Sequence, residues 1–152
     1  LVTARIHLLS PDLRRPGRVG DLIIPVLDPE EGDREEFVRW MVKPVWDGEL
    51  SMPQLADLQV ATFDYSAAAF ASIRSELTAK RTMKGASLEF VEILSLIRDH
   101  LSPAIRETRR FQTLQALLNC TRRSLLPNPD VTDDERMRWQ QELDELGRRG
   151  VS

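Results

Sequence analysis

The chain contains very few of the residue types that build metal centres and disulfides. Of its 152 residues, one is cysteine and two are histidine. These three residues, Cys120, His7 and His100, lie far apart, and no His-x-x-x-His or Cys-x-x-Cys spacing occurs. A zinc site and an intramolecular disulfide are therefore not expected, and we predict no cofactor. A lone cysteine fits a reducing, intracellular compartment.

Long apolar runs are also missing. No stretch approaches the ~18 apolar residues of a membrane-spanning helix, and the first residues, which include Arg5 and His7, do not resemble a signal peptide. Apolar residues make up 41% of the chain and charged residues 30%, as in ordinary globular proteins. We predict a soluble protein with no membrane partner, of a length that fits one domain.

Sequence motifs for catalysis are absent as well. Neither the G-x-S-x-G motif of nucleophilic serines nor the two common glycine-rich phosphate loops occurs. The best candidates for catalysis are the carboxylates between Asp28 and Glu36, taken together with His100. Negative charge at a helix start explains those carboxylates without chemistry. We therefore predict no enzymatic activity and no small-molecule substrate.

Helical periodicity dominates from residue 28 onward. Asp28-Pro29 is a plausible start for the first helix, which Pro44 ends. Ser51-x-x-Gln54 and Thr132-x-x-Glu135 are capping boxes, each of which predicts a helix N-terminus. The predicted helices run from residue 28 or 33 to 43, over 51–62, from 64 to about 80 with Gly85 as C-cap, over 87–100, over 103–125 and over 132–147. The fold class is therefore all-α, either a compact bundle or an orthogonal array of five to six helices.

Apolar residues surround the fourth of these helices almost completely. The sequence LEFVEILSLIRDHL leaves little polar face, and a helix that is apolar all round is usually buried. We therefore predict that this helix lies at the centre of the fold.

The first 27 residues have a different pattern. Residues 1–9 alternate in part between apolar and polar side chains, and DLIIPVL at 21–27 is β-branched and apolar. Pro25 restricts that second run to an edge strand or a bulge. We predict an extended arm or a small hairpin over 1–27, forming one structural unit with a helical domain over 28–152.

Charge is distributed unevenly along the chain, although the net charge is only -3. Residues 1–71 hold 7 basic and 12 acidic side chains, residues 72–123 hold 10 and 5, and residues 124–152 hold 4 and 7. Acidic ends and a basic middle would attract each other, either within one chain or between copies.

Arginine concentrates in the predicted helix over 103–125. Its apolar stripe runs between two basic clusters, and a third cluster closes the preceding long helix. The residues predicted to contact nucleic acid or an acidic protein partner are Arg106, Arg109, Arg110, Arg122, Arg123, Lys80, Arg81 and Lys84. This prediction requires that 103–125 form a single rod with its guanidinium groups exposed.

Two functions remain open from the sequence. The first is a non-enzymatic helical module for protein–protein interaction or self-assembly, acting as a homo-oligomer or as a structural subunit of a larger complex; viral and phage structural proteins offer a class analogy. The residues predicted for assembly contacts are Ile6, Leu8, Ile23, Ile24, Glu30, Glu31, Glu35 and Glu36. The alternative is a nucleic-acid-binding subunit that contacts phosphates through the arginine-rich helix.

Overall fold

A computed structural model describes residue 3, residues 5–101 and residues 105–152 of the chain. These residues form six α-helices and three short 3-10 helices, and none of them forms a β-strand. The predicted all-α class is therefore confirmed. The predicted Ser102-Pro103 helix start lies outside the described residues.

The predicted extended or hairpin arm over 1–27 is not supported. Its described residues up to 21 form two 3-10 helices, η1 (Ile6–Leu8) and η2 (Val19–Asp21), connected by turns, and residues 22–27 run extended without forming a strand. Gly20 shows why the chain turns here: a Cβ at this position would lie 1.9 Å from the carbonyl oxygen of Arg14. Turn chemistry thus outweighs the alternating pattern that suggested strands.

The chain divides into two compact units, each described here by itself. Unit 1 comprises Leu1–Leu27 and Ala104–Ser152, and unit 2 comprises Asp28–Pro103. Residues 104–152 group with the N-terminal segment and not with the other helices.

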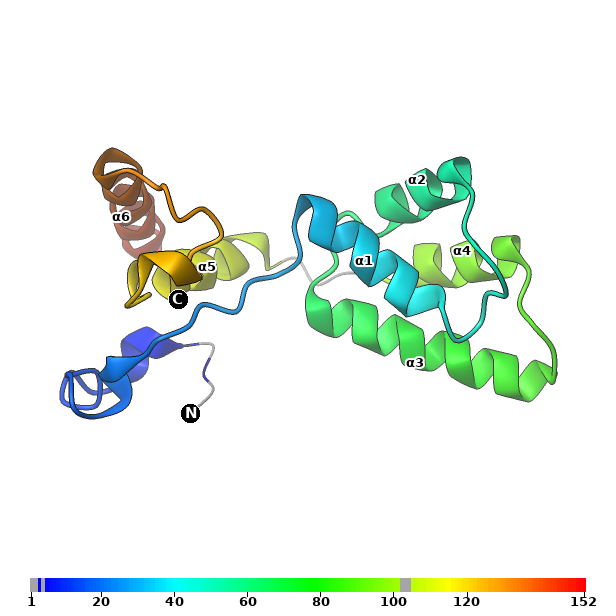
Figure 1. Cartoon of the computed structure of the whole chain (residues 1–152), viewed down its shortest axis with the longest axis horizontal. Helices are drawn as coiled ribbons and strands as arrows, with labels where there is room; N and C mark the ends of the chain where they lie inside the picture. Colours follow the sequence, from blue (N-terminus) through cyan, green and yellow to red (C-terminus); the bar gives the residue numbers. More distant parts are fainter. Residues whose placement is uncertain (1–2, 4, 102–104) are drawn as a thin grey trace. The chain divides into compact units, whose positions relative to one another are not determined.

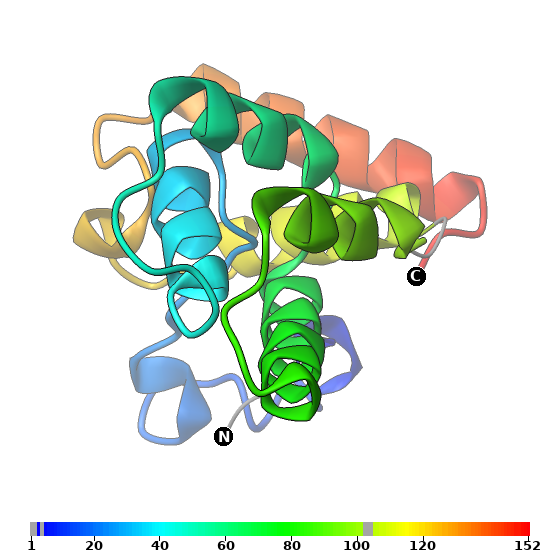
Figure 2. The same ribbon diagram turned by 90° about the vertical axis from the view of Figure 1, so that its right-hand side faces the viewer.

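Unit 2 contains four helices around one core. They are α1 (Glu31–Val42), α2 (Met52–Ala61), α3 (Ala67–Lys84) and α4 (Phe90–Asp99). α1 contacts α2 and α3, and α4 contacts the same two helices (Figures 1 and 2). Phe70 and Ile73 of α3, with Leu58 of α2 and Met41 of α1, are fully buried at the centre.

Side-chain caps fix where several of these helices begin and end. Ser51 and Gln54 form the predicted capping box at α2, and Gly85 ends α3 with φ at 68°, as predicted. Asp28 was predicted to cap α1, but the cap residue of α1 is Glu30, and the carboxylate of Asp28 instead accepts a hydrogen bond from the backbone N–H of Ala67 at 3.3 Å. Asp28 therefore accepts from the first N–H of α3, 39 residues away, and adds to the cap that Ser66 provides there.

The prediction that the fourth helix is fully buried is wrong. Ile93 and Ile97 of α4 face the core, whereas Val91 is 70% exposed and Leu101, just after the helix, is 88% exposed. The helix also starts later than predicted, because Glu89 and Glu92 form its capping box. α4 is thus an edge helix with uncovered apolar side chains.

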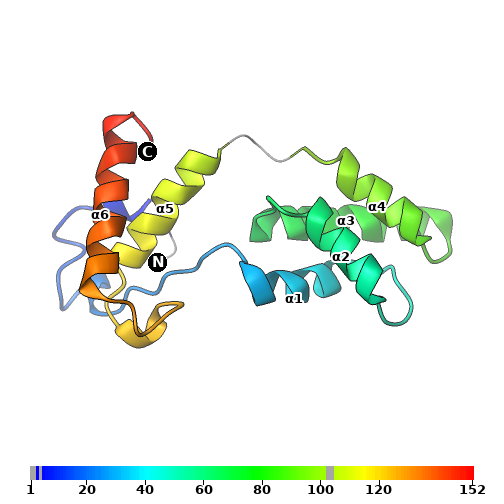
Figure 3. The ribbon, with the colours of Figure 1, turned by 90° about the horizontal axis from the view of Figure 1, so that it is seen from above.

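Unit 1 is built on two packed helices, α5 (Arg106–Leu118) and α6 (Asp133–Arg148) (Figure 3). Phe111 and Leu114 of α5 pack against Leu143 and Leu146 of α6. A third 3-10 helix, η3 (Arg123–Leu125), lies between them in the chain. The Thr132–Glu135 capping box predicted for α6 is present.

The prediction of a single helix over 103–125 is wrong. α5 ends at Leu118, and the backbone N–H of Thr121 donates to the carbonyl oxygen of Ile23 at 3.4 Å. The hydroxyl of Thr121 accepts from the N–H of Ile23 at 3.0 Å. Thr121 is thus bonded to a residue 98 positions away in sequence and does not continue the helix. Arg122 and Arg123 therefore lie beyond α5.

Candidate functional site

The basic cluster on α5 is held by ion pairs within unit 1. Arg110 donates from Nε and from a terminal guanidinium nitrogen to the two carboxylate oxygens of Glu142, at 2.7 and 2.6 Å. Arg149, the C-cap residue of α6, donates from one guanidinium nitrogen to one carboxylate oxygen of Glu107 in α5. Arg106 and Arg109 also have interaction partners. Because these guanidinium groups already have partners, a phosphate would have to compete for them.

The second basic cluster is separated from the first. Arg123 donates to the carbonyl oxygen of Val131 and lies 3.4 Å from the carboxylate of Asp133, while Arg122 is exposed on the loop after α5. These contacts tie the loop to the start of α6. The continuous rod of exposed cations that the predicted basic contacts require is therefore absent from the described residues.

The Arg110–Glu142 pair gives a pH-dependent contribution to stability. The hydrogen bonds from Arg110 hold the pKa of Glu142 below its usual value of 4.5, against an opposing effect of burial. A lowered carboxyl pKa adds stability above pH 4.5, and that stability is lost as pH falls through the lower, folded-state value.

We predict that Glu142→Gln removes this dependence. The expected loss at neutral pH is about 0.5–1 kcal/mol at most, since both side chains are partly exposed to solvent. Urea unfolding at pH 7 and below pH 4 measures this loss. The difference in free energy of unfolding between wild type and variant should disappear below pH 4. Glu145→Gln, on the same helix, controls for the loss of one charge, and an equal effect of both variants would contradict the assignment.

The third basic cluster, at the end of α3 in unit 2, is likewise engaged. Arg81 donates to the carbonyl oxygen of Pro44 and lies 3.5 Å from the carboxylate of Asp47, and Lys84 lies 2.6 Å from Glu92. The Lys84 hydrogen bond is the largest cause of the lowered pKa of Glu92. Lys80 is half-buried between these groups.

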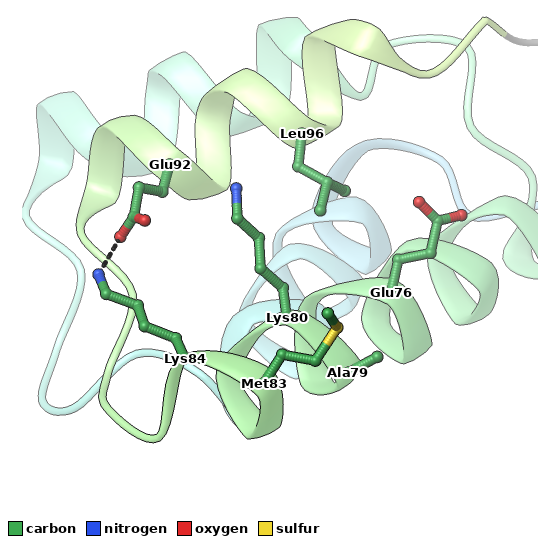
Figure 4. Close-up of a pocket in the computed structure, with 7 residues that line it drawn as sticks. All are labelled: Glu76, Ala79, Lys80, Met83, Lys84, Glu92 and Leu96. Carbon is green, nitrogen blue, oxygen red and sulfur yellow. Dashed lines mark hydrogen bonds and ion pairs between the residues drawn. The ribbon is translucent and has the colours of Figure 1, made fainter.

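Lys80 lines the hollow between α3 and α4 that Figure 4 shows. Its volume is about 620 Å³. Ala79, Met83 and Leu96 supply apolar walls. Lys84 pairs with Glu92 at one end of the hollow, and Glu76 lies at the other end. The two carboxylates balance the two ammonium groups in formal charge, and the walls between them are apolar.

The carboxylates considered for catalysis do not converge on His100. Asp28 caps α3, and Glu35 lies 2.8 Å from Arg39 within α1. His100 follows α4, with its ring edge-on to that of Tyr65 at 5.2 Å. Within the described residues, no group of three or more His, Cys, Asp or Glu side chains could hold a metal ion.

Sequence reasoning missed the outer face of α2. Leu55 and Leu58 point into the core, but Met52, Val60 and the following Phe63 are each more than 70% exposed. Met52, Ala56 and Val60 recur at intervals of four, which places them on one helix face. That repeat was the available signal, and it gives α2 an exposed apolar strip in addition to the face that Leu55 and Leu58 bury.

The residues predicted for assembly have mixed environments. Leu8 and Ile24 are exposed apolar side chains, and Ile6 and Ile23 are half-buried within unit 1. Glu30 and Glu36 are exposed at the start of α1, whereas Glu35 is paired with Arg39. Glu31 opens the same helix. No helix among the described residues is long and apolar enough to span a bilayer.

Comparison with protein-family models, with curated proteins and with solved structures finds no match to this chain. A proposal about its function therefore rests on the surfaces described above.

Proposed function

We propose that the chain is a non-enzymatic protein–protein interaction module that self-associates and serves as an assembly subunit. The observation that carries this proposal is the apolar outer face of α2, formed by Met52, Val60 and Phe63. A helix whose apolar side chains extend beyond its buried face is normally covered there as well. Contiguous exposed apolar patches on a protein surface often mark sites of interaction with other proteins.

The arrangement of charge supports the same proposal over nucleic-acid binding. Arg110, Arg123 and Arg149 pair with carboxylates of their own unit. Such pairs lower the net positive charge available to a polyanion. The basic middle of the chain is thus balanced internally, and uncovered apolar side chains are the more prominent surface feature.

We predict that the double variant Met52→Lys/Val60→Lys weakens self-association at least about tenfold, because two charges would have to be buried at the contact. Sedimentation velocity over a range of protein concentrations measures the effect. Both side chains project into solvent, so the variant should fold normally and keep its helical circular dichroism.

Met137→Lys is the matched control, since Met137 is an exposed methionine on α6. It should associate as wild type does. The proposal would be contradicted if the wild-type chain remained a 17.4 kDa monomer at every concentration and salt level. If the α2 double variant associated as wild type does, the α2 face would not be the contact surface.

A further inference from the structure

The segment after η2 has an alternating pattern of exposure. Residues 22–30 contain no helix, turn or bend, and they lead as an extended run into α1 (Figures 1 and 3). Leu22, Ile24 and Val26 are 50%, 55% and 89% exposed, whereas the residues between them are half-buried. This is the alternation of a strand with one face on its own unit and the other in solvent.

One edge of this segment is already occupied. Ile23 exchanges two hydrogen bonds with Thr121, one through its N–H and one through its carbonyl oxygen. In an extended chain the backbone groups of neighbouring residues point to opposite edges. The N–H and C=O groups of Leu22, Ile24 and Val26 therefore face away from Thr121, and among the described residues they have no hydrogen-bond partner.

We propose that residues 22–26 pair antiparallel with the same residues of a second copy, around a two-fold axis at Ile24. The inference deepens the proposed self-association and rests on it. In this register Ile24 faces the second copy's Ile24, and Leu22 faces its Val26. These facing pairs provide about six backbone hydrogen bonds and bring the exposed apolar side chains together on one face.

Pro25 is compatible with this register. It has no N–H to donate, which usually disqualifies a residue from pairing on both sides. In the proposed pairing Pro25 faces the second copy's Ile23, and the backbone groups of both point toward their own units. The missing donor thus falls at a pair that exchanges no hydrogen bonds.

Charge complementarity identifies a second copy as the occupant. Arg14 and Arg18 precede the segment, together with Asp21 and an Arg15 that pairs with Asp12, and Glu30 and Asp33 follow it. Antiparallel pairing brings the end that carries Arg18 in one copy toward the end that carries Glu30 in the other. A parallel arrangement would place like charges together. Arg18 and Glu30 are both exposed, and the described residues contain no ion pair of either.

Cysteine pairs test the register directly. In a Cys120→Ser background, Leu22→Cys and Val26→Cys chains are mixed and oxidised with copper phenanthroline, and disulfide-linked dimers are scored on non-reducing gels. We expect the mixture to cross-link and each variant alone to give about tenfold less product. Facing residues of a hydrogen-bonded pair lie about 5.5 Å apart between Cα atoms, within disulfide range. Each variant alone controls for random collision.

Charge reversal tests the same pairing through self-association, without introducing a cysteine. Arg18→Glu and Glu30→Arg should each weaken self-association in sedimentation, and the double variant should restore it, because the reversed charges again face each other. Raised salt should reduce all of these differences.

The outcomes separate this inference from the proposed function. Wild-type self-association with no cross-link in the mixture overturns the pairing and leaves the assembly function standing. Strong cross-linking of each variant alone indicates a parallel pair and also overturns it. A wild-type chain that stays monomeric and does not cross-link overturns both the pairing and the proposed self-association. The unpaired edge of residues 22–26 would then be available to a strand of another protein.

Discussion

Replacing Phe70 by alanine is expected to lower the free energy of unfolding of unit 2 by about 3–5 kcal/mol. Phe70 is fully buried on α3, with ring centroids 5.4 Å from both Phe37 and Tyr65. The substitution removes apolar burial and leaves a cavity that neighbours from three segments fill only in part. Domains are typically stable by only 5–15 kcal/mol in total, so this loss is large.

Phe63 provides a matched control for that experiment. The guanidinium carbon of Arg34 lies 5.9 Å from the ring centroids of both Phe63 and Phe70. Phe63, however, is exposed. Phe63→Ala should therefore cost less than about 1 kcal/mol. Chemical denaturation gives the magnitudes, and hydrogen exchange of peptides from 28–103 locates the loss. Equal losses from the two variants would mean that Phe70 does not anchor this core.

Local signals determined much of the helical fold. The capping boxes at Ser51 and Thr132 and the C-cap at Gly85 lie where the sequence predicts them, since each depends only on residues within one turn of the helix end. Such features transfer directly from sequence to structure.

The errors arose from contacts between distant residues. Asn119 is a residue type found at helix C-termini, but apolar periodicity continues to Leu125 and favours a longer helix; the partner that draws Thr121 away is Ile23. Asp28 has the residue type of a cap, but the helix that it caps is α3. A sequence pattern gives the preference of a segment and not the tertiary partner that overrides it.

The candidate surfaces were predictable to a similar extent. The arginines of α5 could be located from the sequence, but their ion-pair partners, such as Glu142 for Arg110, come from a helix 32 residues away. The apolar content of α4 suggested complete burial, whereas its position at the edge of unit 2 leaves Val91 in solvent. Residue type indicates which groups are present, and packing decides which remain uncovered.

Tyr65 is expected to make the stability of unit 2 fall steeply above pH 10. Its hydroxyl donates to the carbonyl oxygen of Ile97 at 2.9 Å, and its side chain is buried. Burial, reinforced by the negative charge of Glu76, raises the pKa of Tyr65 to about 12 from an ordinary value of 10.0. Below pH 10 the phenol is protonated in both the folded and the unfolded chain, so stability does not depend on it.

Between pH 10 and 12 the unfolded chain releases this proton while the folded chain retains it, so folding becomes less favourable as pH rises. Two pKa units correspond to about 2–3 kcal/mol. Tyr65→Phe cannot ionise and should lack this loss, although it should cost about 1 kcal/mol at neutral pH because Ile97 loses its donor. The variant should therefore become the more stable protein near pH 12.

The same residue allows a direct optical measurement, because it is the only tyrosine in the chain. The near-ultraviolet absorbance of tyrosinate should rise with a midpoint near pH 12 in the folded protein and near pH 10 in urea. Lysine and arginine titrate in wild type and variant alike, so their contributions cancel in the difference between the two stability curves. A folded-state midpoint near pH 10 would mean that the phenol is solvated, and the contact between Tyr65 and α4 would then lose its assigned role in holding that helix against the core.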